Sequence, residues 1–272
     1  MTSGLSVCLI VRDEAERIRA ALDSVRPIAD EIIVVDTGSL DGTPGIAIAL
    51  GARVESFPWR DDFAAARNFA FDLARGDWIL SLDADQILEN PEALPHPLTG
   101  EGYRLRIVDS GIESWRVGLF RAHARMIGKI HEYFDPPLRT IDCGIRLRHE
   151  GYSGGPNESK HRRNIPLLVS ELAERPDRLD VRIELARTLN ALGDDSALDD
   201  ALAHIDPSSP PVAGYIAMLI ETILMRPALK RPEWVSFYAT RWFPTSPPIR
   251  WILARLAADA GDFELSRTHL QS

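Results

Sequence analysis

The chain has 272 residues, a formal net charge of −9 at pH 7 and 45% apolar residues, a composition that is ordinary for a folded globular protein. The negative charge argues against a general nucleic-acid binder, which normally carries a basic surface. The only two cysteines, Cys8 and Cys143, offer neither a disulfide framework nor a metal-binding spacing, so we expect buried thiols.

The beginning of the chain lacks the basic and apolar regions of a secretory signal. No apolar run approaches the ~18 residues that a membrane span requires. From these two features we expect a cytoplasmic protein.

Apolar runs and helical spacings alternate along the first part of the chain. Strands are predicted at residues 5–11, 31–35 and 53–57 and again from 78, with helices between them. The third helix is expected over Phe63–Arg75, with Phe63, Ala66, Ala70 and Leu73 facing inward. Such alternation predicts βαβ units and a parallel sheet.

The fourth strand runs into two carboxylates, Asp83 and Asp85. Residues two apart on extended chain point the same way, so we expect both to face one site. Ligands of open α/β sheets bind at that end of the strands, and paired carboxylates suit Mg²⁺ or Mn²⁺. The alternative is a polar strand end without function.

Beyond the acid pair, a loop rich in proline and glycine is predicted over residues 90–102. Three alternating apolar patterns then predict half-buried strands around residues 103–107, 115–119 and 141–147, as a mixed sheet beside the first. His149 continues the inward phase of the last of these strands.

From about Lys160 the pattern is helical. Residues 185–194 resemble residues 253–262 at an offset of 68, which is twice the 34-residue period of tetratricopeptide helix pairs. A middle copy is expected near residues 210–232, although its sequence is too degraded to align. We therefore predict two domains, residues 1–158 and 159–272.

Four motifs in the first 90 residues, taken together, resemble family 2 glycosyltransferases with the GT-A fold. They are Ser6–Glu14, Glu31–Ser39 with Asp41–Thr43, Ala66–Asn68, and Asp83–Asp85. The resemblance continues more weakly through residues 130–132, 149–152 and 160–164, like a bacterial subgroup with helical repeats after the catalytic domain. It implies an α/β fold, a GT-A mixed sheet domain, followed by an all-α, tetratricopeptide-like tail.

The resemblance also implies the donor site for a nucleotide diphosphate sugar, with a UDP-sugar as the family's usual donor. The implied donor-binding residues are Val11, Arg12, Asp13, Glu14, Asp36, Arg67, Asn68, Asp83, Ala84, Asp85, Lys160 and Arg163. Three alternatives stay open: Asp36 could only cap its turn, Arg67 could pair with Asp61 or Asp62, and the basic run from Lys160 could simply be solvated.

Mn²⁺ or Mg²⁺ is the implied cofactor, with Asp83, Asp85 and His149 as implied ligands. His149 could instead be a structural core histidine. Gln86 stands where the family often has a further acid, so one negative charge is missing.

Family 2 enzymes generally invert the anomeric centre, which requires a base for the acceptor proton. Glu132, next to His131, is our first candidate, with these two residues as the predicted catalytic pair. Asp109 and Glu113 are rivals, and a surface salt bridge is the alternative for Glu132.

Chain-polymerising relatives carry membrane helices and a Gln-x-x-Arg-Trp motif, but Tyr238 and Pro247 stand where the glutamine should be. We therefore expect transfer of one sugar to a glycan, lipid-linked or peptide acceptor. Residues 226–255 are rich in Lys, Arg and Trp; helix packing is favoured over contact with a membrane surface or an acidic partner. A homodimer is also left open.

Two other classes of function compete with this hypothesis. A degenerate transferase domain could serve as a scaffold whose repeats bind a protein. A nucleotidyltransferase also places a metal at an α/β sheet, but its Gly-rich loop with Arg and Lys is missing after the first strand.

Overall fold

The computed structural model describes residues 4–109, 111–150, 158–194, 196–197, 201, 204 and 247–271. The chain divides into two compact units, residues 1–156 and 157–272. No helix in the described ranges has both the length and the apolar character needed to cross a bilayer.

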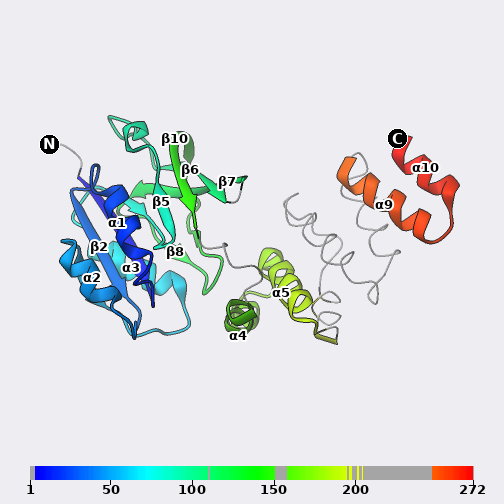
Figure 1. Ribbon diagram of the computed structural model, residues 1–272, viewed down its shortest axis with the longest axis horizontal. Helices are drawn as coiled ribbons and strands as arrows, with labels where there is room; N and C mark the ends of the chain where they lie inside the picture. Colours follow the sequence, from blue (N-terminus) through cyan, green and yellow to red (C-terminus); the bar gives the residue numbers. More distant parts are fainter. Residues whose placement is uncertain are drawn as a thin grey trace. The chain divides into compact units, whose positions relative to one another are not determined.

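One eight-stranded sheet organises the first unit (Figure 1), in the order β3-β2-β1-β4-β7-β6-β10-β5. The strands are β1 (Leu5–Val11), β2 (Glu31–Asp36), β3 (Arg53–Ser56), β4 (Trp78–Ser81), β5 (Gln86–Leu88), β6 (Gly102–Asp109), β7 (Ile112–Arg121) and β10 (Thr140–His149). The first four pair in parallel, and β7 joins antiparallel to β4. The later strands therefore extend the same mixed sheet, as the GT-A fold requires, and a separate ribbon pairs β8 (Met126–Ile127) with β9 (Tyr133–Phe134).

Helices α1 (Ile18–Val25), α2 (Thr43–Ala49) and α3 (Phe63–Asp72) connect the parallel strands. Apolar residues of α1 and α3 pack into two separate buried clusters of the sheet domain, which explains why β1 is buried almost throughout. The buried side chains of α3 are Ala64, Ala66, Ala70 and Phe71. Leu73 is partly buried and packs against the same cluster, as predicted, whereas Phe63 is not part of it. The helix ends at Asp72 rather than at Arg75.

The register between β10 and β6 shifts between Asp142 and Arg146. Because of this irregularity, Ile141 is 54% exposed instead of facing inward as predicted, whereas Cys143, Ile145 and Leu147 are buried. Cys8 and Cys143 are free, buried thiols, as expected.

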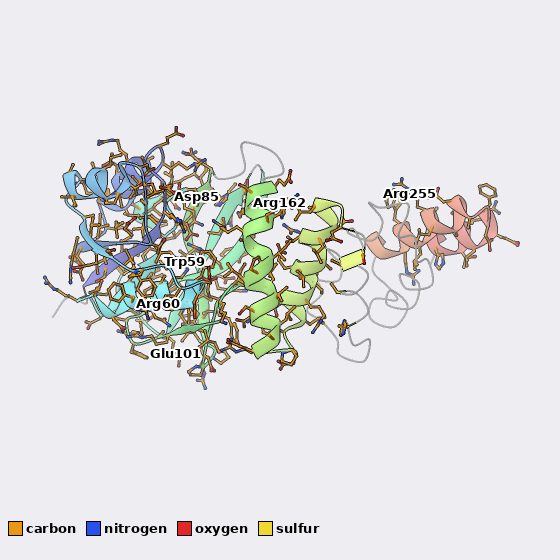
Figure 2. The ribbon with its side chains drawn as sticks, turned by 90° about the horizontal axis from the view of Figure 1, so that it is seen from below. Trp59, Arg60, Asp85, Glu101, Arg162 and Arg255 are labelled. Carbon is orange, nitrogen blue, oxygen red and sulfur yellow. The ribbon has the colours of Figure 1, made fainter. Side chains whose placement is uncertain are left out.

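β4 and β10 end at the same edge of the sheet. β7 is antiparallel to both β4 and β6, and β10 is parallel to β6, so β10 runs in the same direction as β4. Asp85 follows β4 and His149 closes β10, whereas Glu101, just before β6, lies at the opposite edge (Figure 2). The fold thereby brings the predicted acid and histidine positions to one edge.

In the second unit, α4 (Glu158–Glu174) packs on α5 (Leu179–Leu192), and α9 (Pro247–Asp259) packs on α10 (Phe263–Gln271). The buried carboxylate of Glu171 accepts hydrogen bonds from Arg175 at 2.9 Å and from Arg178 at 3.1 Å. These contacts tie the end of α4 to the turn before α5.

The two copies of the sequence repeat end their helices in the same way. Gly193 and Gly261 both have positive φ, 79° and 83°. The N–H of Asp194 donates to Leu189 O at 3.1 Å, and the N–H of Asp262 makes the matching bond to Ala257 O at 2.8 Å. The offset of 68 thus marks a repeated helix end; the middle copy, near residues 210–232, lies outside the described residues.

Candidate active site

The acid pair lies in a turn rather than on the strand. β4 ends at Ser81, and the N–H of Gln86 donates to Asp83 O at 3.0 Å to close the turn. The chain is not extended there, and Asp83 and Asp85 contact different partners; that both face one site stays a prediction.

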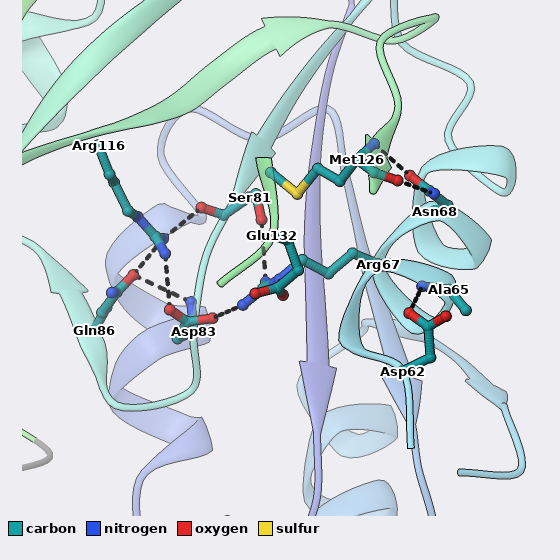
Figure 3. Close-up of polar contacts among 10 residues, drawn as sticks. All are labelled: Asp62, Ala65, Arg67, Asn68, Ser81, Asp83, Gln86, Arg116, Met126 and Glu132. Carbon is teal, nitrogen blue, oxygen red and sulfur yellow. Dashed lines mark hydrogen bonds and ion pairs between the residues drawn. The ribbon is translucent and has the colours of Figure 1, made fainter. Parts of the chain in front are cut away.

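Asp83 is held between two arginines (Figure 3). Arg67 Nη2 donates to Asp83 Oδ1 at 2.8 Å, and Arg116 Nη1 donates to Oδ2 at 2.9 Å. Burial raises the pKa of Asp83, but the two guanidinium groups outweigh it and hold that pKa well below its usual range. Ligation of a metal by Asp83 remains a prediction, and each of its oxygens already accepts from an arginine.

Arg67, on α3, connects Asp83 with the candidate base. Its Nε donates to Glu132 Oε1 at 2.8 Å, and its Nη1 donates to Ser81 Oγ at 3.3 Å. Burial lowers the pKa of Arg67, but the charges of Asp83 and Glu132 outweigh burial and raise that pKa above its usual value. Arg67 is therefore charged at any working pH.

The alternative partners proposed for Arg67 are wrong because both have other contacts. Asp62 is the N-cap of α3 and accepts from Ala65 N at 2.8 Å, while Asp61 accepts from Trp59 Nε1 at 2.7 Å. A side chain at an N-cap is directed at the helix end, which removes Asp62 from the reach of Arg67.

Asp85 and His149 meet at the carboxyl edge of the sheet. His149 Nε2 lies 3.2 Å from Asp85 Oδ2, and Nδ1 lies 3.5 Å from Asp109 Oδ2. The hydrogen bond to Asp85 raises the pKa of His149, against the opposing effect of burial.

These groups bear on the implied metal. An imidazole nitrogen and a carboxylate oxygen side by side are a suitable pair of ligands for an Mn²⁺-like ion. No group of three or more His, Cys, Asp or Glu side chains with metal-binding geometry occurs among the described residues. Asp85 and His149 therefore fit a cation whose remaining ligands come from substrate or water, and ligation by Asp83 stays a prediction.

The loops after β1 and β2 are bonded to each other at the same edge. The N–H of Leu40 donates to Asp13 Oδ1 at 2.7 Å, and the N–H of Asp13 donates to Ser39 Oγ at 2.9 Å. Asp36 accepts from the N–H groups of Gly38 and Ser39, which is the turn-capping arrangement named above. Its predicted contact with a nucleotide base remains a prediction.

The remaining candidates fall into three environments. Val11 and Ala84 are buried, whereas Arg12 is half-exposed. Burial raises the pKa of Glu14, and the nearby charge of Asp85 contributes to the same shift. Asn68 bonds both the N–H and the C=O of Met126, at 3.0 and 2.8 Å, and so holds the start of β8.

His131 is an exposed residue with φ of 53°, and it directly precedes Glu132. Lys160 and Arg163 lie near the start of α4 in the second unit. Their predicted closure over a diphosphate stays a prediction.

One site residue, Arg116, escaped the sequence analysis. Arg116 Nη2 donates to Ser81 O at 2.9 Å and to Gln86 Oε1 at 2.7 Å, besides the contact with Asp83. Gln86 Oε1 also accepts from Asp83 N at 3.2 Å, so the residue that replaces an acid acts here as an acceptor for arginine. Arg116 lies at a polar position of an alternating strand, and only the pairing of β7 with β4 reveals its role.

A cavity of about 370 Å³ adjoins this network, with Arg67, Ser81, Arg116 and Glu132 in its lining. The candidate base thus faces a space large enough for a small acceptor group, beside the acidic turn after β4.

Comparison with known proteins shows a similarity in the first part of the chain. Residues 6–96 match the model described as glycosyl transferase family 2. A TPR repeat-containing protein of Synechococcus elongatus is 56% identical over 84 residues, which is 31% of this chain and 21% of that protein. The glycosyltransferase SunS of Bacillus subtilis is 29% identical over 223 residues, 73% of this chain and 52% of that one.

A solved structure, glucosyl-3-phosphoglycerate synthase of Mycobacterium tuberculosis in complex with Mn²⁺, UDP and glucosyl-3-phosphoglycerate, is 32% identical over 40% of this chain and 44% of its own, with a TM-score of 0.33. The chain spans between a fifth and about half of the length of these proteins. Residues 6–96 of the sheet domain are thus similar to glycosyl transferase family 2.

Proposed function

We propose that this chain transfers a single sugar, with inversion, from a nucleotide diphosphate sugar to an acceptor hydroxyl. A UDP-sugar is the proposed donor, and a glycan, a lipid-linked sugar or a peptide the proposed acceptor. The observation that carries the proposal is the meeting of Asp85 and His149, 3.2 Å apart, at the carboxyl edge of the sheet where ligands of such folds bind.

In this proposal the loops after β1 and β2, with Arg12, Asp13 and Asp36, hold the nucleoside. Their mutual hydrogen bonds fix the edge before a ligand arrives, which lowers the entropic cost of binding. Asp85 and His149 would hold the divalent cation, whose charge stabilises the leaving diphosphate when it is bound.

Glu132 is the proposed base. Arg67 Nε bonds Oε1 and orients the carboxylate, and among the described residues no group donates to Oε2. The acceptor oxygen forms a bond to the anomeric carbon, its proton passes to Glu132, and the bond to the diphosphate breaks with its electron pair on the leaving oxygen.

The test is calorimetric titration of UDP in the presence and absence of Mn²⁺, with hydrolysis of UDP-glucose, UDP-galactose and UDP-N-acetylglucosamine as the turnover assay. We expect Mn²⁺ to strengthen UDP binding in the wild type and Asp85→Asn to abolish that gain. Asp142→Asn is the control, because Asp142 is half-exposed and pairs with Arg104. Absence of UDP binding both with and without Mn²⁺ would overturn the proposal.

One observation favours a second candidate, the scaffold whose helical repeats bind a protein partner. Both oxygens of Asp83 are bonded to arginine, as described above. UDP binding without any turnover of the sugar donors, unchanged by Asp85→Asn, would support it.

A further inference from the structure

The cavity beside Glu132 has two unlike walls. Its polar wall is formed by Arg67, Ser81, Arg116 and Glu132, which approach it from α3, β4, β7 and the segment before β9. Its other lining residues are Val117, Met126, Tyr133, Phe134 and Pro137. A ligand that fills it must therefore match a polar end and an apolar body.

The polar wall is largely committed to internal bonds. Arg67 donates to Glu132, Ser81 and Asp83, and Arg116 donates through its two terminal nitrogens (Figure 3). Arg116 Nε, however, is buried and has no hydrogen-bond partner among the described residues. A buried donor without a partner costs free energy, and a ligand oxygen would remove that cost once the Arg116 side chain shifts to expose it. The polar wall therefore has few atoms without an internal hydrogen bond, and Glu132 Oε2 and Arg116 Nε are among them.

The apolar wall is firmly held. Asn68 clamps the Met126 backbone in both directions, and the Met126 side chain extends from there toward Ser81 and Glu132 (Figure 3). Phe134 packs edge-on against Phe120, with ring centroids 4.7 Å apart. Such a wall is suited to an apolar group of fixed shape.

A free sugar presents hydroxyl groups on every side, and each hydroxyl buried without a partner costs binding energy. Apart from the Tyr133 hydroxyl, the polar groups of the described lining lie in one wall and mostly bond one another, so the lining offers a sugar few partners. One hydroxyl on a compact apolar body would match both walls.

We propose that the cavity is the acceptor site and that it takes an acceptor whose reacting hydroxyl is carried on a compact aryl or alkyl body. The inference rests on the proposed function for the reaction itself and narrows its proposed acceptors by excluding those that react through a sugar hydroxyl. The acceptor oxygen bonds to the anomeric carbon, its proton passes to Glu132, and the nucleoside diphosphate leaves.

The first test measures acceptor binding without the donor. Saturation-transfer NMR would compare benzyl alcohol and 1-hexanol with methyl β-glucoside and methyl β-galactoside. The variant Met126→Gln keeps an unbranched side chain but makes the wall polar, and Met126→Leu is its apolar control. We expect the two alcohols to bind and the glycosides not to, with Met126→Gln weakening benzyl alcohol binding about tenfold and Met126→Leu changing it less than twofold.

Val117→Thr provides a second polar wall variant of similar shape on a strand, should Met126→Gln fail to fold. The second test adds the three UDP-sugars and measures UDP release above the rate of donor hydrolysis. Glycosides that bind better than the alcohols, or alcohol binding unchanged by both polar variants, would overturn the inference.

The two proposals fail in different ways. If UDP-sugars are hydrolysed but neither alcohol binds in the cavity, the acceptor class is wrong and the transferase remains. If UDP does not bind and no donor is hydrolysed, the transferase itself is wrong, whatever the cavity binds.

Discussion

Arg116 Nη1 donates to Asp83 Oδ2 at 2.9 Å and so bonds β7 to the turn after β4. Arg116→Lys would keep the charge but lose the planar fork that also reaches Ser81 O and Gln86 Oε1. We expect the free energy of unfolding to fall by about 1–3 kcal/mol, because buried acceptors lose their donor. Urea denaturation checks this value.

Arg104→Lys is the matched control for Arg116. Arg104 pairs with Asp142 at 2.7 Å on a half-exposed surface, where an ion pair contributes less than about 1 kcal/mol. If the two lysine variants lost the same stability, the bonds between β7 and the turn would contribute no more to the free energy of unfolding than a surface ion pair.

The pairing of Glu132 with Arg67 allows catalysis to be separated from stability. In Glu132→Gln the amide oxygen still accepts from Arg67 Nε, so we expect the free energy of unfolding to change by less than about 1 kcal/mol. Loss of the base should lower the rate of sugar transfer at least about 100-fold. UDP affinity should be unchanged, and transfer that survives in Glu132→Gln would assign the base elsewhere.

Two glycines provide opposite tests of packing. A Cβ at Gly76 would meet Gly4 O at 2.5 Å, a backbone atom that cannot move aside, whereas one at Gly45, within α2, would meet nothing within 4 Å. We expect Gly76→Ala to lower the free energy of unfolding by about 1–3 kcal/mol. Gly45→Ala should raise it by about 0.5–1 kcal/mol, and denaturation of both variants measures the contrast.

Asp13 has φ of 55°, a conformation that Asn tolerates and Ala does not, and its carboxylate accepts from Leu40 N. Asp13→Ala should lower the free energy of unfolding by about 1–2 kcal/mol, whereas Asp13→Asn, which retains an acceptor, should lose less. Calorimetric melting of both variants tests this order, and equal losses would contradict it.

The sequence predicts the parallel half of the sheet well because short-range patterns specify it. The continuous apolar run of residues 5–11 becomes β1 with the predicted bounds, and the helix beginning at Ile18 ends at Val25, before Pro27. The contact between His149 and Asp85 also follows from the alternation of inward positions along the last strand, once both strands are known to end at one edge.

The arginine network could not be predicted in the same way. Arg116 reaches Asp83 only because β7 pairs antiparallel with β4, and Arg67 reaches Glu132 across a large separation in sequence. Local periodicity in the sequence does not predict which distant strands pair. Asp83 and Asp85 have different partners for a further reason. β4 stops at Ser81, and the alternation of an extended chain does not apply beyond it.

The buried thiol of Cys8 predicts a dependence of stability on alkaline pH. Burial, followed by the charge of Glu31, raises the pKa of Cys8, and its Sγ lies 3.6 Å from Ala70 O. The unfolded thiol ionises near pH 8.5, so the stabilisation is complete below that pH and is lost as the pH rises toward the folded-state pKa. Between pH 8.5 and 10 we expect the free energy of unfolding to fall by up to about 1.4 kcal/mol per pH unit from this group. Urea denaturation of the wild type and Cys8→Ala isolates the effect, because the variant should be less stable at neutral pH yet show a shallower alkaline slope. Identical slopes would mean that Cys8 ionises equally in both states.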